Sequence, residues 1–96
     1  MEHIIKPSVR FSVSPDAIFQ RLHGEIVILD MTSDAYFGLN SSGAFIWESL
    51  SGGATIEETA MNLANRYPVE IERARRDTIS LATELASRGL IVPVEK

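Results

Sequence analysis

Few side chains of this sequence could perform catalysis, and each of them has a structural explanation. Ser41 and Ser42 stand at the predicted start of a helix, where hydroxyl groups cap free backbone N–H groups, and no histidine or cysteine lies beside them to activate a nucleophile. The adjacent carboxylates of Glu57 and Glu58 fall in the first turn of another predicted helix, a position that the helix dipole favours. The sequence therefore predicts a protein that is not an enzyme.

Candidate sites for a metal or a cofactor are equally scarce. The chain has no cysteine, and its two histidines, His3 and His23, are far apart in the sequence. Gly52 and Gly53 follow a predicted helix rather than a strand, and no Gly-Lys-Ser or Gly-Lys-Thr motif comes after them. They indicate the end of a helix and not a phosphate-binding loop. We expect neither a metal nor a cofactor.

Composition and charge narrow the class of protein. The 96 residues carry a net charge of −4, which argues against a general nucleic-acid binder because neutralising phosphates requires concentrated Lys and Arg. The N-terminus lacks a basic segment followed by a long apolar run, and no stretch of about 18 consecutive apolar residues occurs. We therefore expect a cytoplasmic protein.

The first half of the chain has the pattern of strands joined by short turns. Residues 9–13 alternate apolar and polar side chains, as a half-buried extended segment does. Three further strands are predicted over residues 17–22, 25–31 and 35–39, with turn-forming residues between them. These three predict an antiparallel meander. Its last strand is an edge with free backbone N–H and C=O groups, unless the order in space differs from the order in sequence.

The second half has helical spacing. Asn40 offers a cap for a helix over 41–51, and residues 55–58, Thr-Ile-Glu-Glu, fit the capping box at the start of a second helix. A third helix is predicted over about 70–88, with Gly89 as a left-handed cap. No repeat or linker divides the chain, so we predict an α+β fold in one domain, residues 1–96, with three strands followed by three helices.

The third helix carries two apolar stripes at helical spacing. We predict a core seam of Ile71, Ala74, Thr78, Leu81 and Leu85. The neighbouring stripe consists of Arg75, Ile79, Ala82 and Ala86. The arginines of this helix indicate either a solvated face or a site for an acidic partner, such as DNA or an acidic peptide. Beside an edge strand, the second stripe would form a groove suited to strand addition by an extended peptide.

These features together resemble a known family. The run GEIVILDMTSDAYFGLNSSGAFIWESLSGG followed by TIEETAMNLANRYPVEIERARRDTISLATELASRGLI is similar to the small PqqD-like proteins, the peptide-recognition elements of ribosomal natural-product (RiPP) pathways. The resemblance covers about residues 24–92, and residues 1–21 match it less clearly. It implies a three-stranded sheet before a winged-helix-like three-helix bundle. It is nearer to the branch that serves lasso-peptide biosynthesis than to the branch of pyrroloquinoline quinone synthesis.

The resemblance implies a function in peptide delivery. The leader of a precursor peptide is expected to add as a strand along 35–39, beside the third helix, and to be held for a processing enzyme, the separate cysteine protease that removes the leader. The residues implied for peptide binding are Asp34, Ala35, Tyr36, Phe37, Gly38 and Leu39 on the strand and Arg75, Arg76, Ile79, Ala82, Thr83 and Ala86 on the helix.

Three alternatives stay open at the level of the sequence. One is a PqqD-type chaperone that presents its peptide to a radical enzyme. Another is a winged-helix DNA-binding protein, because three helices with a small sheet and an arginine-bearing helix also describe that class. The third is a homodimer that pairs the free edge strand with itself.

Overall fold

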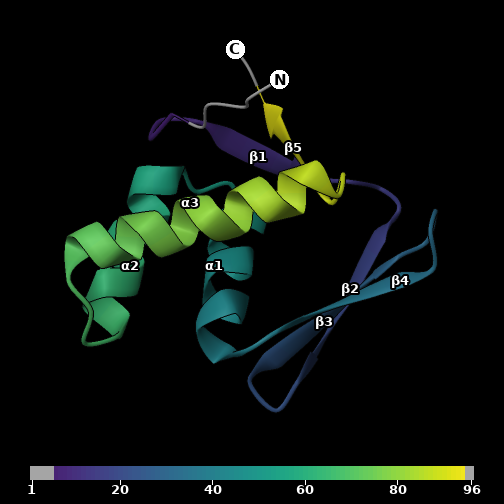
Figure 1. The fold of residues 1–96 in the computed structure, drawn as a ribbon, viewed down its shortest axis with the longest axis horizontal. Helices are drawn as coiled ribbons and strands as arrows, with labels where there is room; N and C mark the ends of the chain where they lie inside the picture. Colours follow the sequence, from purple (N-terminus) through teal and green to yellow (C-terminus); the bar gives the residue numbers. More distant parts are fainter. Residues whose placement is uncertain (1–5, 95–96) are drawn as a thin grey trace.

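The fold is α+β, with two small antiparallel sheets and three helices (Figure 1). A computed structural model describes residues 6–94. The elements are β1 (Arg10–Val13), β2 (Ala17–Leu22), β3 (Glu25–Asp30), β4 (Ala35–Leu39), α1 (Ser41–Ser51), α2 (Ile56–Arg66), α3 (Ile71–Ser87) and β5 (Ile91–Val94). The predicted order of three strands followed by three helices is confirmed.

The larger sheet has the strand order β2-β3-β4, so neighbours in sequence are neighbours in space. His23 and Gly24 join β2 to β3, and both have positive φ angles, of 54° and 83°. Two such residues make the tight hairpin turn whose twist matches the twist of the strands. The predicted meander is therefore formed, and β4 is one of its two edges.

The smaller sheet pairs the two ends of the described chain. The extended segment predicted at 9–13 becomes β1, and it pairs antiparallel with β5, from Arg10 opposite Val94 to Val13 opposite Ile91. β5 begins two residues after Gly89, the cap predicted for the third helix. The strand β5 was not predicted.

The helix caps that the sequence suggested are present. The Asn40 side chain accepts a hydrogen bond from the Gly43 backbone N–H at 2.9 Å at the start of α1. At the start of α2, Thr55 and Glu58 form the reciprocal capping box. Gly89 ends α3 with φ of 75°. These caps fix where each helix begins or ends, because they satisfy backbone groups that have no partner inside the helix.

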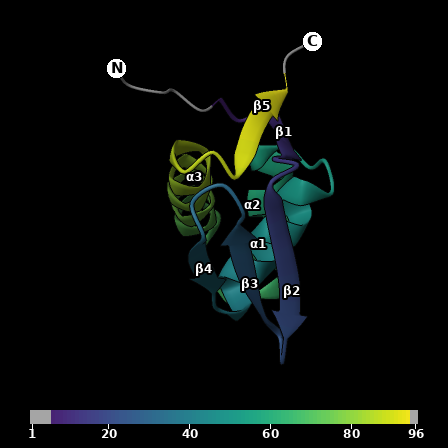
Figure 2. The ribbon, with the colours of Figure 1, turned by 90° about the vertical axis from the view of Figure 1, so that its right-hand side faces the viewer.

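The hydrophobic core lies between one face of the larger sheet and the helices. Ile26 and Ile28 of β3 are fully buried, as are Trp47 and Leu50 of α1. Phe19 of β2 contacts the Trp47 ring edge-on, with ring centroids 5.3 Å apart. Figure 2 shows α1 behind the sheet and α3 on the side of β4. This packing sets the distance and the angle between β4 and α3.

Candidate peptide-binding groove

The strand β4 has one side that is unpaired. It is bonded to β3 from Ala35 opposite Asp30 to Leu39 opposite Ile26. Within residues 6–94, no strand pairs with its other side. An edge strand presents a row of free N–H and C=O groups that another chain can use. The edge of β4 is therefore available to a guest strand.

The register identifies which backbone groups of β4 are free. The Met31 N–H donates to the Asp16 carbonyl at 2.9 Å, in line with the β2–β3 pairing, so the backbone of Met31 points toward β2. Successive residues of a strand point their backbone groups to opposite sides. Ile28 therefore bonds toward β4, to Phe37, and the backbone groups of Tyr36 and Gly38 point away from β3 to the open edge.

The side chains of β4 alternate between the two faces of the sheet. Ala35, Phe37 and Leu39 lie on the face toward the helices, where Leu39 is only 6% exposed and Phe37 is half-buried. Tyr36 and Gly38 lie on the outer face, and Tyr36 is 73% exposed. Leu39 thus contributes to the core, and its side chain is not available to a guest. The predicted division of β4 into two faces agrees with these exposures.

The C-terminal end of α3 forms the opposite wall of a groove beside β4. The Arg88 guanidinium lies over the Phe37 ring, 4.8 Å from its centroid, and so links helix and strand. Glu84 lies one turn before Arg88 and accepts a hydrogen bond from it at 3.2 Å. Leu81 lies two turns before Arg88 on the same side of the helix and is half-buried. Helical spacing thus places these three residues on one side of α3, and Arg88 contacts β4 directly.

A hollow of about 250 Å³ opens between β4 and the end of α3. It is roomy enough for one large side chain. Its lining is mixed, because apolar surface is joined by a carboxylate, a hydroxyl and a guanidinium. The lining residues are Asp30, Ser33, Ala35, Tyr36, Phe37, Arg88 and Leu90.

The turn at the mouth of this hollow is held by Asp30. Its carboxylate accepts hydrogen bonds from the Thr32 backbone and hydroxyl groups and from the Ser33 hydroxyl at 3.0 Å. These bonds, led by the one from the Thr32 hydroxyl, lower the pKa of Asp30. Asp34, which was predicted to bind peptide, lies in the same turn with φ of 59° and donates its N–H to the Asp30 carbonyl at 2.8 Å. The carboxylate of Asp30 thus orders the turn that precedes β4.

The predicted helix wall needs correction. Ala82 is fully buried in the core, whereas Leu81, expected in the core seam, is only half-buried. Arg75, the first residue of the predicted wall, is bonded to Glu57 of α2. Ile79 and Ala86 of the same stripe are half-buried. Helical spacing relates residues of one stripe to each other, but it does not say which neighbouring element that stripe faces. The remaining two predicted residues, both exposed and on the side of α3 away from Arg88, are Arg76 and Thr83.

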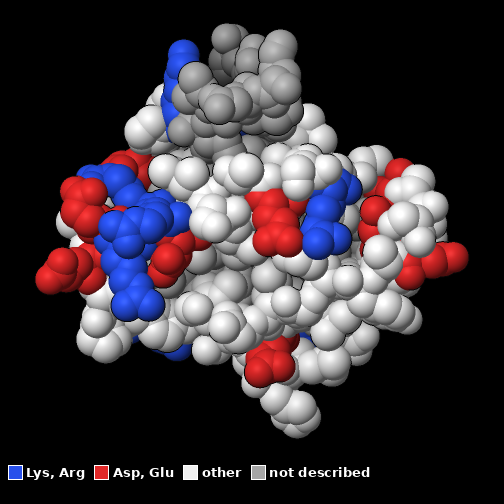
Figure 3. Space-filling view, in the orientation of Figure 1, with Lys and Arg blue, Asp and Glu red and all other residues white. Residues whose placement is uncertain are grey.

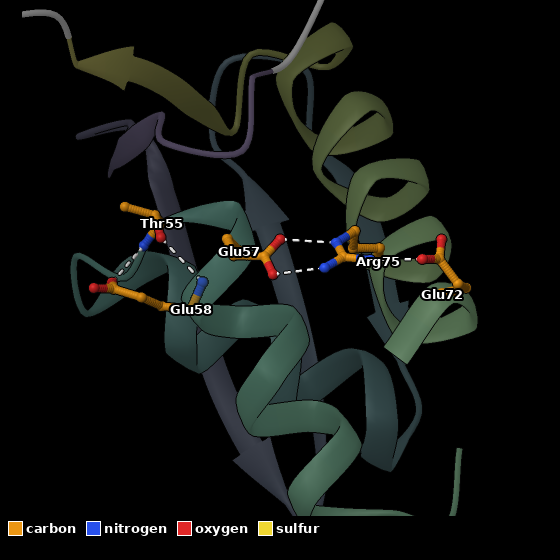
Figure 4. A network of polar contacts seen from close by, with 5 residues as sticks. All are labelled: Thr55, Glu57, Glu58, Glu72 and Arg75. Atoms are coloured by element: carbon orange, nitrogen blue, oxygen red, sulfur yellow. Dashed lines mark hydrogen bonds and ion pairs between the residues drawn. The ribbon is translucent and has the colours of Figure 1, made fainter. Parts of the chain in front are cut away.

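Arg75 has a structural partner instead of a free guanidinium. Its Nε and Nη2 donate to the two carboxylate oxygens of Glu57 at 2.8 and 2.9 Å, and its Nη1 donates to Glu72 at 2.9 Å (Figure 4). The hydrogen bonds from Arg75 lower the pKa of Glu57, and the same contact raises the pKa of Arg75. Such a bidentate pair fixes the position of α2 against α3.

The basic side chains at the beginning of α3 do not form the concentrated patch that a DNA reader needs. Figure 3 shows basic side chains over the beginning of α3, and acidic side chains lie among them. Arg73 forms an ion pair with Asp77 at 3.7 Å, and Arg75 is shared between two glutamates. Since phosphate binding requires a concentrated basic surface, this mixed patch gives the DNA-binding alternative no support.

Within residues 6–94, no cluster of three or more metal-ligating side chains is found. The same part of the chain contains no helix that is both long and apolar enough to cross a membrane.

Most of this chain matches a known protein family. The family model of "Coenzyme PQQ synthesis protein D (PqqD)" matches residues 25–91, which span β3, β4, the three helices and the start of β5. The chain belongs to the PqqD family. No curated protein sequence matches it.

Two solved structures have the same fold as this PqqD family member. One is "TbiB1 in Complex with the TbiA(beta) Leader Peptide", with a TM-score of 0.80 and 26% identity. The other is "Lasso peptide synthetase B1 complexed with the leader peptide", with a TM-score of 0.80 and 31% identity. In both comparisons 88% of this chain and 99% of the other chain are covered. The chain is thus a PqqD-like RiPP recognition element, homologous to proteins that bind leader peptides.

Some groove residues were missed by sequence reasoning. Arg88 was noted as one of several arginines, and Leu81 was assigned to the core. Leu90, which is buried, also lines the hollow. One available signal was the spacing of Leu81, Glu84 and Arg88, which places them on one side of the helix.

Proposed function

We propose that this protein binds the leader of a ribosomally synthesised precursor peptide by strand addition to β4, beside α3, and holds it for a processing enzyme. The observation that carries the proposal is the open edge of β4, where the backbone groups of Tyr36 and Gly38 point outward next to the wall formed by Arg88. In this proposal residues 1–96 act as one recognition domain and perform no chemical step.

Backbone pairing alone is too weak for useful binding. Two outward-facing residues, Tyr36 and Gly38, provide four groups, and four hydrogen bonds are worth roughly 2–6 kcal/mol in total. Micromolar affinity needs about 8 kcal/mol after the cost of ordering the peptide. A side chain of the guest must therefore supply the remainder. A guest residue opposite Phe37 would face the helices, and the hollow beside Arg88 is the space available to it.

The outer face of the larger sheet supports a role in delivery. Ile18 of β2 is 52% exposed and lies on the same face as Tyr36, with the half-buried Leu29 between them in the register. Adjacent exposed apolar side chains mark surfaces that other proteins contact. A strand added at β4 would extend this face, so an enzyme that docks there would meet the bound peptide as well. We infer that the enzyme is the leader protease of a lasso-peptide pathway.

Titration with the leader tests the binding step. The fluorescently labelled leader of a precursor encoded beside the gene is titrated with the purified protein, with a scrambled leader and a DNA duplex as controls. We expect saturable binding of the leader alone. Binding of DNA, or equal binding of the scrambled peptide, would contradict the proposal. Size-exclusion chromatography with and without leader tests the alternative that β4 pairs with a second copy.

Amide hydrogen exchange tests the strand addition itself. In the free protein the amides of Phe37 and Leu39 are bonded to β3, whereas those of Tyr36 and Gly38 face the open edge. We expect bound leader to slow the exchange of the Tyr36 and Gly38 amides and to leave the exchange rates of the Phe37 and Leu39 amides nearly unchanged. Protection confined to another element would place the peptide elsewhere.

A further inference from the structure

Gly38 has no structural reason to be glycine in the free protein. It lies inside β4, where glycine weakens a strand because it has no side chain to pack and loses more backbone entropy. Its φ angle is not in the left-handed region, which among the glycines is found at 24, 53 and 89. A Cβ atom added to Gly38 would meet nothing within 4 Å. The glycine therefore leaves a space that no part of residues 6–94 fills.

This space lies on the outer face at the open edge. Its floor is Val27, which is opposite Gly38 in the register and half-buried. Tyr36, two residues earlier on the same face, stands beside it with its ring 73% exposed. A large exposed aromatic ring and bare backbone thus lie side by side at the edge where a guest strand would pair.

A guest strand would place a side chain directly at this space. The N–H and C=O of Gly38 point to the open edge, so in antiparallel addition the guest residue opposite Gly38 would form a hydrogen-bonded pair with it. Residues opposite each other in a sheet project their side chains on the same face, so this side chain would lie on the outer face. Aromatic side chains are known to cover glycine on a neighbouring strand in this way.

We propose that Gly38 is a specificity-determining residue, which selects leaders that carry a large apolar side chain, best an aromatic one, opposite it. That side chain lies across Gly38 onto Val27 and packs against the Tyr36 ring. This inference rests on the proposed strand addition and goes beyond it, because the selected side chain faces away from the helices and from the hollow beside Arg88.

A double-mutant cycle tests this inference. Gly38→Thr introduces a branched side chain into the space that the guest residue would occupy, and Gly38→Ala introduces a smaller one. Gln20→Thr is the matched control, because Gln20 lies on the same face but on the far strand β2. We expect thermal unfolding of Gly38→Thr at an unchanged or higher temperature, since threonine favours strands more than glycine does.

Each residue of the leader is then replaced by alanine in turn, and the affinity of every such leader is measured for the wild-type protein and for Gly38→Thr. We expect Gly38→Thr to bind the unmodified leader about tenfold more weakly than the wild type does. Gly38→Ala should lower the affinity less, and Gln20→Thr should leave it unchanged. At one large apolar position of the leader, alanine substitution should lower the affinity for the wild-type protein about tenfold and leave the affinity for Gly38→Thr almost unchanged. Equal losses in both proteins, or full affinity of Gly38→Thr, would overturn the inference while leaving strand addition intact. Absence of protection at the Tyr36 and Gly38 amides would instead remove the proposed function itself.

Discussion

Replacing Tyr36 by proline removes one backbone donor from the open edge without touching the β3–β4 hydrogen bonds. The Tyr36 N–H points away from β3, so in the free protein it is available to water. Proline is tolerated in an edge strand when its missing N–H faces solvent. The variant Tyr36→Ala is the matched control, because it also loses the ring but keeps the N–H. The difference between these two variants isolates the backbone group.

The size of the effect follows from the four outward-facing groups of Tyr36 and Gly38. Losing one of four pairing groups costs about 0.5–1.5 kcal/mol, which corresponds to roughly a two- to thirteenfold increase in Kd. The proline ring also stands where the guest backbone would approach, so the upper part of this range is expected. Stability of the free protein should be nearly the same for Tyr36→Pro and Tyr36→Ala.

Two measurements test whether the Tyr36 N–H pairs with the leader. Urea unfolding compares the stabilities of the two variants, and fluorescence anisotropy with the labelled leader compares their affinities. Equal leader affinity for Tyr36→Pro and Tyr36→Ala would refute strand addition at this edge. A large loss of stability in Tyr36→Pro alone would show that its N–H is bonded within the protein, contrary to the register described above.

Three further predictions concern the helices. Arg88→Ala should weaken leader binding several-fold in the anisotropy assay, because Arg88 lies over Phe37 in the groove, whereas Arg76→Ala, on the far side of α3, should not. Thr55→Ala should lower the free energy of unfolding by about 1 kcal/mol in urea and leave leader affinity unchanged, since it removes a helix cap. Glu57→Gln should destabilise the protein at pH 7. Arg75 lowers the pKa of Glu57 in the folded state, so this contribution is fully present above the ordinary glutamate pKa of about 4.3 and is lost as the pH falls below it. The stability difference between Glu57→Gln and the wild type, measured by thermal unfolding across pH 3–7, should therefore shrink in acid, and a constant difference would contradict the role of the pair.

Local features of this protein were determined by the sequence itself. The capping box at Thr55 and Glu58, the Asn40 cap and the left-handed Gly89 were all predicted and are all present. The three strands of the larger sheet were predicted with their turns. Each of these features depends on residues within a few positions of each other, so the side-chain types at those positions are sufficient to specify it.

Only the tertiary structure decided which side of α3 faces β4. The spacing of Arg75, Ile79, Ala82 and Ala86 defined a stripe, but the rotation of α3 about its own axis depends on every element packed against it. In the folded chain Arg75 of that stripe is bonded to Glu57 of α2, 18 residues away, whereas Arg88 lies over Phe37 of β4. The pairing of β1 with β5 was out of reach for the same reason, because it joins opposite ends of the chain. Helical and strand periodicity specify angles within one element, whereas the contacts that orient whole elements come from residues distant in sequence.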